Sequence, residues 1–333
     1  MASPTIWNSI IDLSETSFHQ LHPQKSSGER RKTFLRQTDS DMQVDITHVA
    51  LRSIIDQVKG CISNVSVMWN TEKQCDQDLM MALSSHAVGR DINSAIYWLA
   101  VRLDLATALA SDRDMYMPLP PSFPYFTEVD LVADPFEMVF FYACRPLWLC
   151  ARAIQFMHNE EVCPDRPPLR IWIQLVEGLQ QWYRERPKEF QPMLELELED
   201  QLTGPEGSFP VVLFANGAGL FGNQLYHTAM LILLHNRPRT ARIDLQSVAM
   251  SPLWHAQRIC SIALHNDRRE CWDPCLLASF LLAARRMTHE SQQREVVRGF
   301  DRIREFQVAD APASTPSSLS FNVTDQVEYN YVF

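Results

Sequence analysis

A tyrosine and a histidine, Tyr226-His227, lie inside a run of leucine, isoleucine, methionine and alanine residues. An imidazole changes charge near neutral pH, so His227 could act as an acid or base, or could recognise a polar group of a ligand. A histidine in such an apolar helix can also be a core residue that donates one ring proton to a carbonyl. We therefore expect a core role for His227, and the alternative is that Tyr226 and His227 are candidates for a ligand pocket.

Trp98 and Arg102 form a second candidate pair. They lie four positions apart, which places them on one face of a helix. Arg102 is surrounded by apolar residues, and a buried guanidinium without a partner is very costly. We therefore expect a structural ion pair with Asp104 or with an acidic residue of another helix, and binding of an anionic ligand is the alternative.

Acidic residues gather in two places, Asp130, Asp134 and Glu137, and residues 266–270 with Asp273. Two such clusters facing each other across a helical cavity would suit a magnesium-diphosphate enzyme such as a terpene cyclase. Neither cluster has the aspartate-rich or Asn-Ser-Glu pattern of those enzymes. We interpret both clusters as solvated residues at helix ends, where acidic side chains favour the helix dipole.

Neither a metal nor a cofactor is predicted. The eight cysteines are scattered, mostly in apolar runs, and no Cys-x2-Cys occurs. Cys271 and Cys275 could share a helical face, but two thiols without further ligands make a weak zinc signal. With only ten glycines, the chain also lacks the common phosphate-binding and nucleophile-elbow motifs. These features leave no catalytic residue that the sequence alone can assign.

The charge of the chain argues against binding to phosphates. The net charge is −10 and the pI is near 5.5, whereas non-specific affinity for DNA depends on clustered lysine and arginine. One short basic run, residues 30–32 with Arg36, reads as a solvated linker, with a nuclear-import signal or a residual nucleic-acid contact as the alternatives. Residues 138–157 are apolar but interrupted by Arg145-Pro146 and Arg152, so a buried helix is predicted there and no membrane span.

The pattern of apolar residues indicates how these side chains are positioned. Helical periodicity predicts an all-α fold, a single domain of roughly ten helices with irregular proline-rich connections. Residues 1–43 form a polar segment, 44–306 the helical domain, and 307–333 a low-complexity tail. Within the domain, the acidic segment 195–200 reads as an exposed loop. Helices are expected at 44–61, 76–88, 93–110, 134–158, 169–186, around Tyr226, and at 254–266, 274–286 and 288–306.

Four blocks of the chain resemble, in order, the regulatory (middle homology) domain of fungal-specific zinc-cluster transcription factors. They are residues 96–109; 182–187 with 209–221; 226–234; and 256–264 with 274–285 and 294–305. The resemblance implies a helical domain that controls activity, binds effectors or contacts other regulators. The six-cysteine zinc cluster and its basic linker are absent from this sequence. Sequence-specific DNA binding by the zinc-held helix of that class is therefore not expected.

Two functions are consistent with this resemblance. The first is a regulator of a metabolic or secondary-metabolite pathway, acting in the nucleus or cytoplasm through a small apolar ligand or another regulatory protein. The second is a secondary-metabolite enzyme, a cyclase or pericyclase, that reuses the fold and holds its substrate in an aromatic cavity. An apolar cavity of several hundred Å³ with His227 or Arg102 pointing inward would favour ligand binding. A filled core with an exposed apolar patch would favour a protein partner.

Overall fold

The computed structural model describes residues 52–56, 77–87, 89, 92–123, 135–158, 168–196, 209–241, 247–266 and 273–308. The predicted segment 1–43 and residues 309–333 of the predicted tail 307–333 therefore lie outside the described residues, as does most of the helix expected at 44–61. Residues 307 and 308, expected in the tail, are helical in the structure. The chain forms two compact units, one of residues 1–99 with 303–321 and the other of residues 100–302 with 322–333.

The prediction of an all-α fold is confirmed for the described residues. The smaller unit contains α4 and the first part of α5, and the remaining elements lie in the larger unit, where α12 begins. The predicted helices agree with those of the structure to within a few residues at most ends. The helices are α4 (Gln77–Ser84), α5 (Ile92–Ser111), α7 (Pro135–His158), α8 (Pro168–Glu185), α9 (Gly217–His235), α10 (Pro252–His265), α11 (Pro274–Ala284) and α12 (Glu290–Val308).

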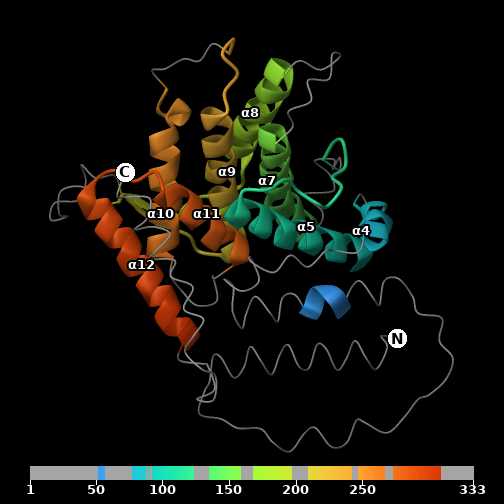
Figure 1. The fold of residues 1–333 in the computed structure, drawn as a ribbon, viewed down its shortest axis with the longest axis horizontal. Helices are drawn as coiled ribbons and strands as arrows, with labels where there is room; N and C mark the ends of the chain where they lie inside the picture. The colour runs from blue at the N-terminus through green and yellow to red at the C-terminus, as the bar shows by residue number, and fades with distance from the viewer. Residues whose placement is uncertain are drawn as a thin grey trace, which may run out of the picture. The chain divides into compact units, whose positions relative to one another are not determined.

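The larger unit is built around α9. This helix contacts α7, α8, α10 and α11, and Figure 1 shows it within that group of helices. Every residue from Gly219 to Leu234 is buried, as expected for a helix that is apolar on all sides. The helix begins where the Asn216 side chain accepts a hydrogen bond from the Gly219 N–H at 2.7 Å.

Capping residues also fix the starts of the next two helices. Ser251 accepts a hydrogen bond from the Trp254 N–H at the start of α10, and Pro252 occupies the first turn, where a proline loses no helical bond. Asp273 caps α11 in the same way, accepting from the N–H groups of Cys275 and Leu276. The helix expected at residues 254–266 is therefore confirmed, with its start at Pro252.

A proline inside α7 shapes the contact with α8. Pro146 has no N–H, so it leaves the carbonyl four residues earlier, that of Tyr142, without its helical donor. The indole Nε1–H of Trp182 in α8 donates to that carbonyl at 3.0 Å. Gly222 of α9 faces the same indole, and a Cβ atom there would lie 3.0 Å from Trp182 Cζ2. A proline, a tryptophan and a glycine thus allow three helices to meet closely.

A two-stranded antiparallel sheet interrupts the helical pattern. β1 (Leu194–Leu196) pairs with β2 (Val211–Leu213), with Glu195 opposite Val212. The expectation of a loop beginning at residue 195 is therefore wrong for its first two residues. Strands of three residues are too short to show the alternation of apolar and polar side chains by which a strand is recognised. Two short 3₁₀ helices, Lys188–Phe190 and Val248–Met250, complete the connections.

Candidate functional site

Trp98 has a structural environment. Its side chain is buried, its Nε1–H donates to the Ala87 carbonyl at 3.2 Å, and its ring meets Tyr97 edge to face at 5.2 Å. Trp98 and both of these partners belong to the smaller unit. These contacts are the ones that a buried indole requires, because its single N–H must find an acceptor. They make Trp98 a core residue of that unit.

Arg102 forms the ion pair expected from the sequence. Its Nε and Nη2 atoms lie 2.8 and 2.6 Å from Asp273 Oδ2, and its guanidinium lies 3.9 Å from the centre of the Phe221 ring. The Cys275 thiol donates to the backbone carbonyl of Arg102 at 2.9 Å. The partner is therefore the capping residue of α11, on another element of the chain. This pair links α5 to the start of α11 and accounts for the Arg102 charge.

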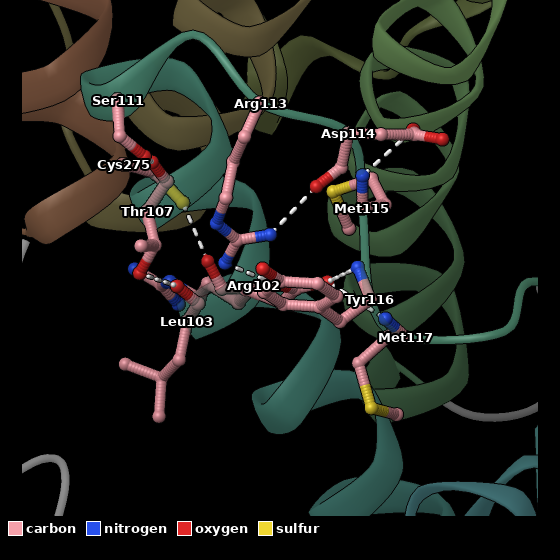
Figure 2. A network of polar contacts seen from close by, with 11 residues as sticks. Arg102, Leu103, Thr107, Ser111, Arg113, Asp114, Met115, Tyr116, Met117 and Cys275 are labelled. Atoms are coloured by element: carbon pink, nitrogen blue, oxygen red, sulfur yellow. Dashed lines mark hydrogen bonds and ion pairs between the residues drawn. The ribbon is translucent and has the colours of Figure 1, made fainter. Parts of the chain in front are cut away.

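Asp104, the other carboxylate considered for Arg102, binds a different arginine. Its Oδ1 atom accepts from Arg113 at 2.7 Å, and its Oδ2 atom accepts from the backbone N–H groups of Tyr116 and Met117 at 2.7 and 2.8 Å. Figure 2 shows the Arg113 side chain reaching back over the Tyr116 ring, 4.0 Å from its centre. This network holds the segment after α5 and leaves the Asp104 carboxylate well satisfied.

Tyr226 and His227 lie in the most buried helix, and His227 contacts a second histidine. His227 Nδ1 lies 2.9 Å from Nδ1 of His255 in α10, and His255 Nε2 lies 3.0 Å from the Ala249 carbonyl oxygen. A carbonyl only accepts, so His255 Nε2 carries a proton. In neutral His255 the Nδ1 atom is then an acceptor, and His227 Nδ1 must be the donor. The hydrogen bonds therefore place a lone pair on His227 Nε2.

Both imidazoles are held in the neutral state. The pKa of His227 is lowered well below its usual value by burial, and further by His255 and by the charges of Arg258 and Arg186. Burial also lowers the pKa of His255 to about 4, although its bond to the Ala249 carbonyl partly opposes the change. At neutral pH the pair therefore carries no charge. Among the described residues, His227 Nε2 has no hydrogen-bond partner.

Aromatic rings from three helices surround this pair. Tyr226 stacks with two rings of α8, Tyr183 at 4.4 Å and Trp182 at 5.9 Å, both close to parallel. The ring of Trp254 in α10 meets His227 edge to face at 5.2 Å. We call this group the α8–α9–α10 aromatic cluster. It consists of Trp182, Tyr183, Tyr226, His227, Trp254 and His255.

Two arginines border the aromatic cluster. Arg258 lies 5.1 Å from the centre of the Trp254 ring and forms an ion pair with Glu195 at 2.6 Å. Arg186 lies 3.5 Å from the centre of the Tyr183 ring and donates through Nη1 to the backbone carbonyl of Tyr183. Its charge acts on both Tyr226 and His227. The cluster therefore combines apolar ring faces with positive charge.

The sequence identified only part of this cluster. Tyr226 and His227 both belong to the cluster, whereas Trp98 and Arg102 have separate sets of contacts. His255 was missed, although it gives the same signal as His227, a histidine in a largely apolar helix. Tyr183 and Arg186 were part of a family-like block but were not singled out. Periodicity places each residue on its own helix and does not reveal which faces of different helices meet.

No group of three or more metal-binding side chains gathers within the described part of the chain. Glu137 lies in the first turn of α7, as expected for a helix end. Asp130, Asp134 and Cys271 fall outside the described residues, as do residues 267–270. Likewise, no helix of the described ranges has both the length and the apolar character needed to cross a membrane.

A small cavity lies between α9, α10 and α11. Its volume is about 10 Å³, and its lining includes Gln224, Asn266 and Phe280. Gln224 Nε2 donates to the Leu276 carbonyl at 2.9 Å, while its buried Oε1 has no partner among the described residues. A space of this size holds about one water molecule and no organic ligand. The aromatic cluster, which this cavity does not include, remains the better candidate for binding.

Comparison of the chain with known proteins adds no assignment, since no family model, curated protein or solved structure matches it. The resemblance to the regulatory domain of fungal zinc-cluster transcription factors therefore stays a prediction from the sequence blocks.

Proposed function

We propose that this chain is a non-catalytic regulatory domain that binds a small, largely apolar effector and acts on transcription through another regulatory protein. The resemblance of its sequence blocks to fungal regulatory domains motivates the regulatory part. The observation that carries the effector part is the aromatic cluster, where a neutral His227 offers an acceptor atom among ring faces. Sites for small ligands combine apolar lining with a few placed polar groups. The cavity seen among the described residues holds only about 10 Å³, so a space of several hundred Å³ would have to open at the cluster when the effector binds.

The location of the cluster supports access by an effector. Tyr183, Arg186 and Trp254 are half-buried, whereas Tyr226 and His227 behind them are buried. A ligand would approach over the half-buried side chains and reach His227 by displacing them. Such a role belongs in the nucleus or cytoplasm, and the acidic net charge of −10 favours action through a protein partner over direct contact with DNA.

The alternative is a cyclase or pericyclase in which His227 moves a proton. The lone pair on His227 Nε2 favours this reading, because a general base needs an acceptor atom facing the substrate. The lowered pKa of His227 argues against it, since a base works best when its pKa lies near the operating pH. Recognition of a donor group on the ligand requires only the lone pair, so binding is the reading we favour.

A reporter assay tests the regulatory function. The chain would be fused to an unrelated DNA-binding module upstream of a reporter gene, with the module alone as the control. We expect the fusion to change reporter output by several-fold, and His227→Phe to weaken the effect at unchanged protein level. Arg184, an exposed residue of α8, provides a matched surface variant, Arg184→Gln, that should behave like the wild type. Equal output from the fusion and the module alone would contradict the proposal.

A further inference from the structure

Arg186 differs from Arg102, Arg113 and Arg258 in having no acidic partner among the described residues. Arg102 pairs with Asp273, Arg113 with Asp104, and Arg258 with Glu195. Among the described residues, the Arg186 guanidinium contacts only the Tyr183 ring and the Tyr183 carbonyl, and its buried Nε atom has no hydrogen-bond partner. A half-buried guanidinium with an unused donor has capacity to bind an anion.

The net charge of the ionisable groups described at the cluster is positive, which also favours an anion. Arg186 and Arg258 contribute two positive charges, Glu195 contributes one negative charge, and the two histidines are neutral at pH 7. Among these described groups, one positive charge is therefore left over beside the aromatic rings. Its field reaches inward as well, because the Arg186 charge acts on both the Tyr226 hydroxyl and the His227 imidazole.

The polar atoms of the cluster also define what a ligand must present. Arg186 supplies donors, so the ligand needs an acceptor, and a carboxylate matches the planar guanidinium best. His227 Nε2 supplies a lone pair, so the ligand needs an O–H or N–H donor. Tyr183 and Tyr226 stack at 4.4 Å, and Arg186 lies against the Tyr183 ring. Surroundings of aromatic and cationic groups suit a ligand with a flat ring.

From these contacts we infer that the effector is an aromatic carboxylate carrying a hydroxyl or N–H donor, with its carboxylate on Arg186 and its donor on His227 Nε2. This inference rests on the proposed effector-binding function and specifies the chemical class of the effector. The carboxylate would take the place of the acidic side chain that Arg102, Arg113 and Arg258 have, and the ring would lie against Trp254.

A pair of isosteric probes tests the class of ligand on the full chain. 6-Hydroxy-2-naphthoate and its neutral amide, 6-hydroxy-2-naphthamide, would be titrated by calorimetry at low and physiological salt. We expect the acid to bind about tenfold tighter or more, as a charge-assisted bond to a guanidinium would give. 2-Naphthoate, which lacks the hydroxyl, should bind more weakly than the hydroxy acid.

Two arginine variants locate the site. Arg186→Gln should remove the preference for the acid, whereas Arg184→Gln, an exposed arginine of the same helix, should keep it. Arg186→Lys should retain part of the preference, because the charge remains. Circular dichroism would establish that each variant is folded, and the comparison of acid with amide on the wild type needs no variant at all.

Each outcome bears on the inference separately from the regulatory function. Equal affinity of acid and amide for the wild type would overturn the carboxylate assignment while leaving an effector site in place. Binding of neither probe, or an equal loss in Arg184→Gln and Arg186→Gln, would overturn the site itself. The reporter assay does not use these probes, so its failure would count against the regulatory function alone.

Discussion

The buried histidine pair makes the stability of this protein depend on pH. His227 and His255 are neutral in the folded state because their pKa values are lowered, in His255 to about 4. In the unfolded chain a histidine has a pKa of about 6.5 and binds a proton more readily. The stability is thus fully present above pH 6.5 and falls as the pH decreases from there toward the folded-state values.

We therefore expect the free energy of unfolding to fall by about 1.4 kcal/mol per pH unit for each histidine below pH 6. Urea melts at pH 7.0, 6.0 and 5.0 would measure the change. In His227→Gln one of the two titrating groups is gone, so the slope over this range should be about half that of the wild type. A wild-type profile that is flat between pH 7 and 5 would show that these imidazoles do not titrate as the structure implies.

Asp273 has two roles that different substitutions can separate. It caps α11 and also binds Arg102, whose side chain is 35% exposed. Asp273→Asn keeps a good capping residue and loses only the ion pair, so it should cost about 1 kcal/mol because Arg102 stays partly exposed to solvent. Asp273→Ala also loses the cap and should cost about 0.5–2 kcal/mol more. Denaturant melts at neutral pH would compare the two, and equal losses would contradict the capping role.

At the level of single residues, the sequence predicts which side chains require a partner but not which residue provides it. It predicts that Arg102 requires a carboxylate, because burial of a lone charge is costly wherever it occurs. It does not predict that the carboxylate is Asp273, since that depends on how α11 is placed against α5. For the same reason His227 was predicted as a candidate, whereas its partner His255 emerges only from the contact between α9 and α10.

The contact between α7 and α8 depends on a helical defect. Pro146 cannot donate to the Tyr142 carbonyl, and the Trp182 indole donates instead. Trp182→Phe should therefore leave that carbonyl without a donor and cost about 1–3 kcal/mol in addition to the loss of packing. When Pro146→Ala is also present, the alanine N–H can bind the carbonyl, so the same tryptophan substitution should cost less.

A double-mutant cycle measures this coupling. Wild type, both single variants and the double variant would be unfolded in urea, and we expect a coupling of about 1 kcal/mol between the two sites. Trp182→Phe loses the same ring volume with Pro146 and with Pro146→Ala, so this loss cancels in the cycle. Additive effects within about 0.3 kcal/mol would mean that the indole does not compensate for the proline.

Elements were predicted well where their signals are local. Serine and proline at the start of α10 and the solvated residues after α5 are encoded within a few positions, so the helices could be placed from the sequence. The strands β1 and β2 could not, because each has three residues and is stabilised by a partner 15 to 19 residues away. Pro146 likewise interrupts the sequence pattern, although α7 continues through it because Trp182 supplies the missing donor.

The whole molecule carries a net charge of −10, which bears on its relation to nucleic acids. Binding to duplex DNA without sequence specificity requires clustered positive charge, and its affinity falls steeply with salt. We expect no shift of short duplex DNA at physiological salt in an electrophoretic assay, and no stoichiometric zinc by metal analysis. Two zinc ions per chain, or a salt-sensitive shift at micromolar protein, would contradict this prediction.

The aromatic cluster also gives the protein an optical signature. Trp182, Tyr226 and Tyr183 are held in a fixed, asymmetric stack that joins α8 to α9. Such rings produce near-ultraviolet circular dichroism only while their packing is fixed, whereas the far-ultraviolet signal follows the helices themselves. Loss of the first signal with retention of the second would mark the loss of fixed side-chain packing while the helices remain helical. The protein thus reports on its own central contact without any added label.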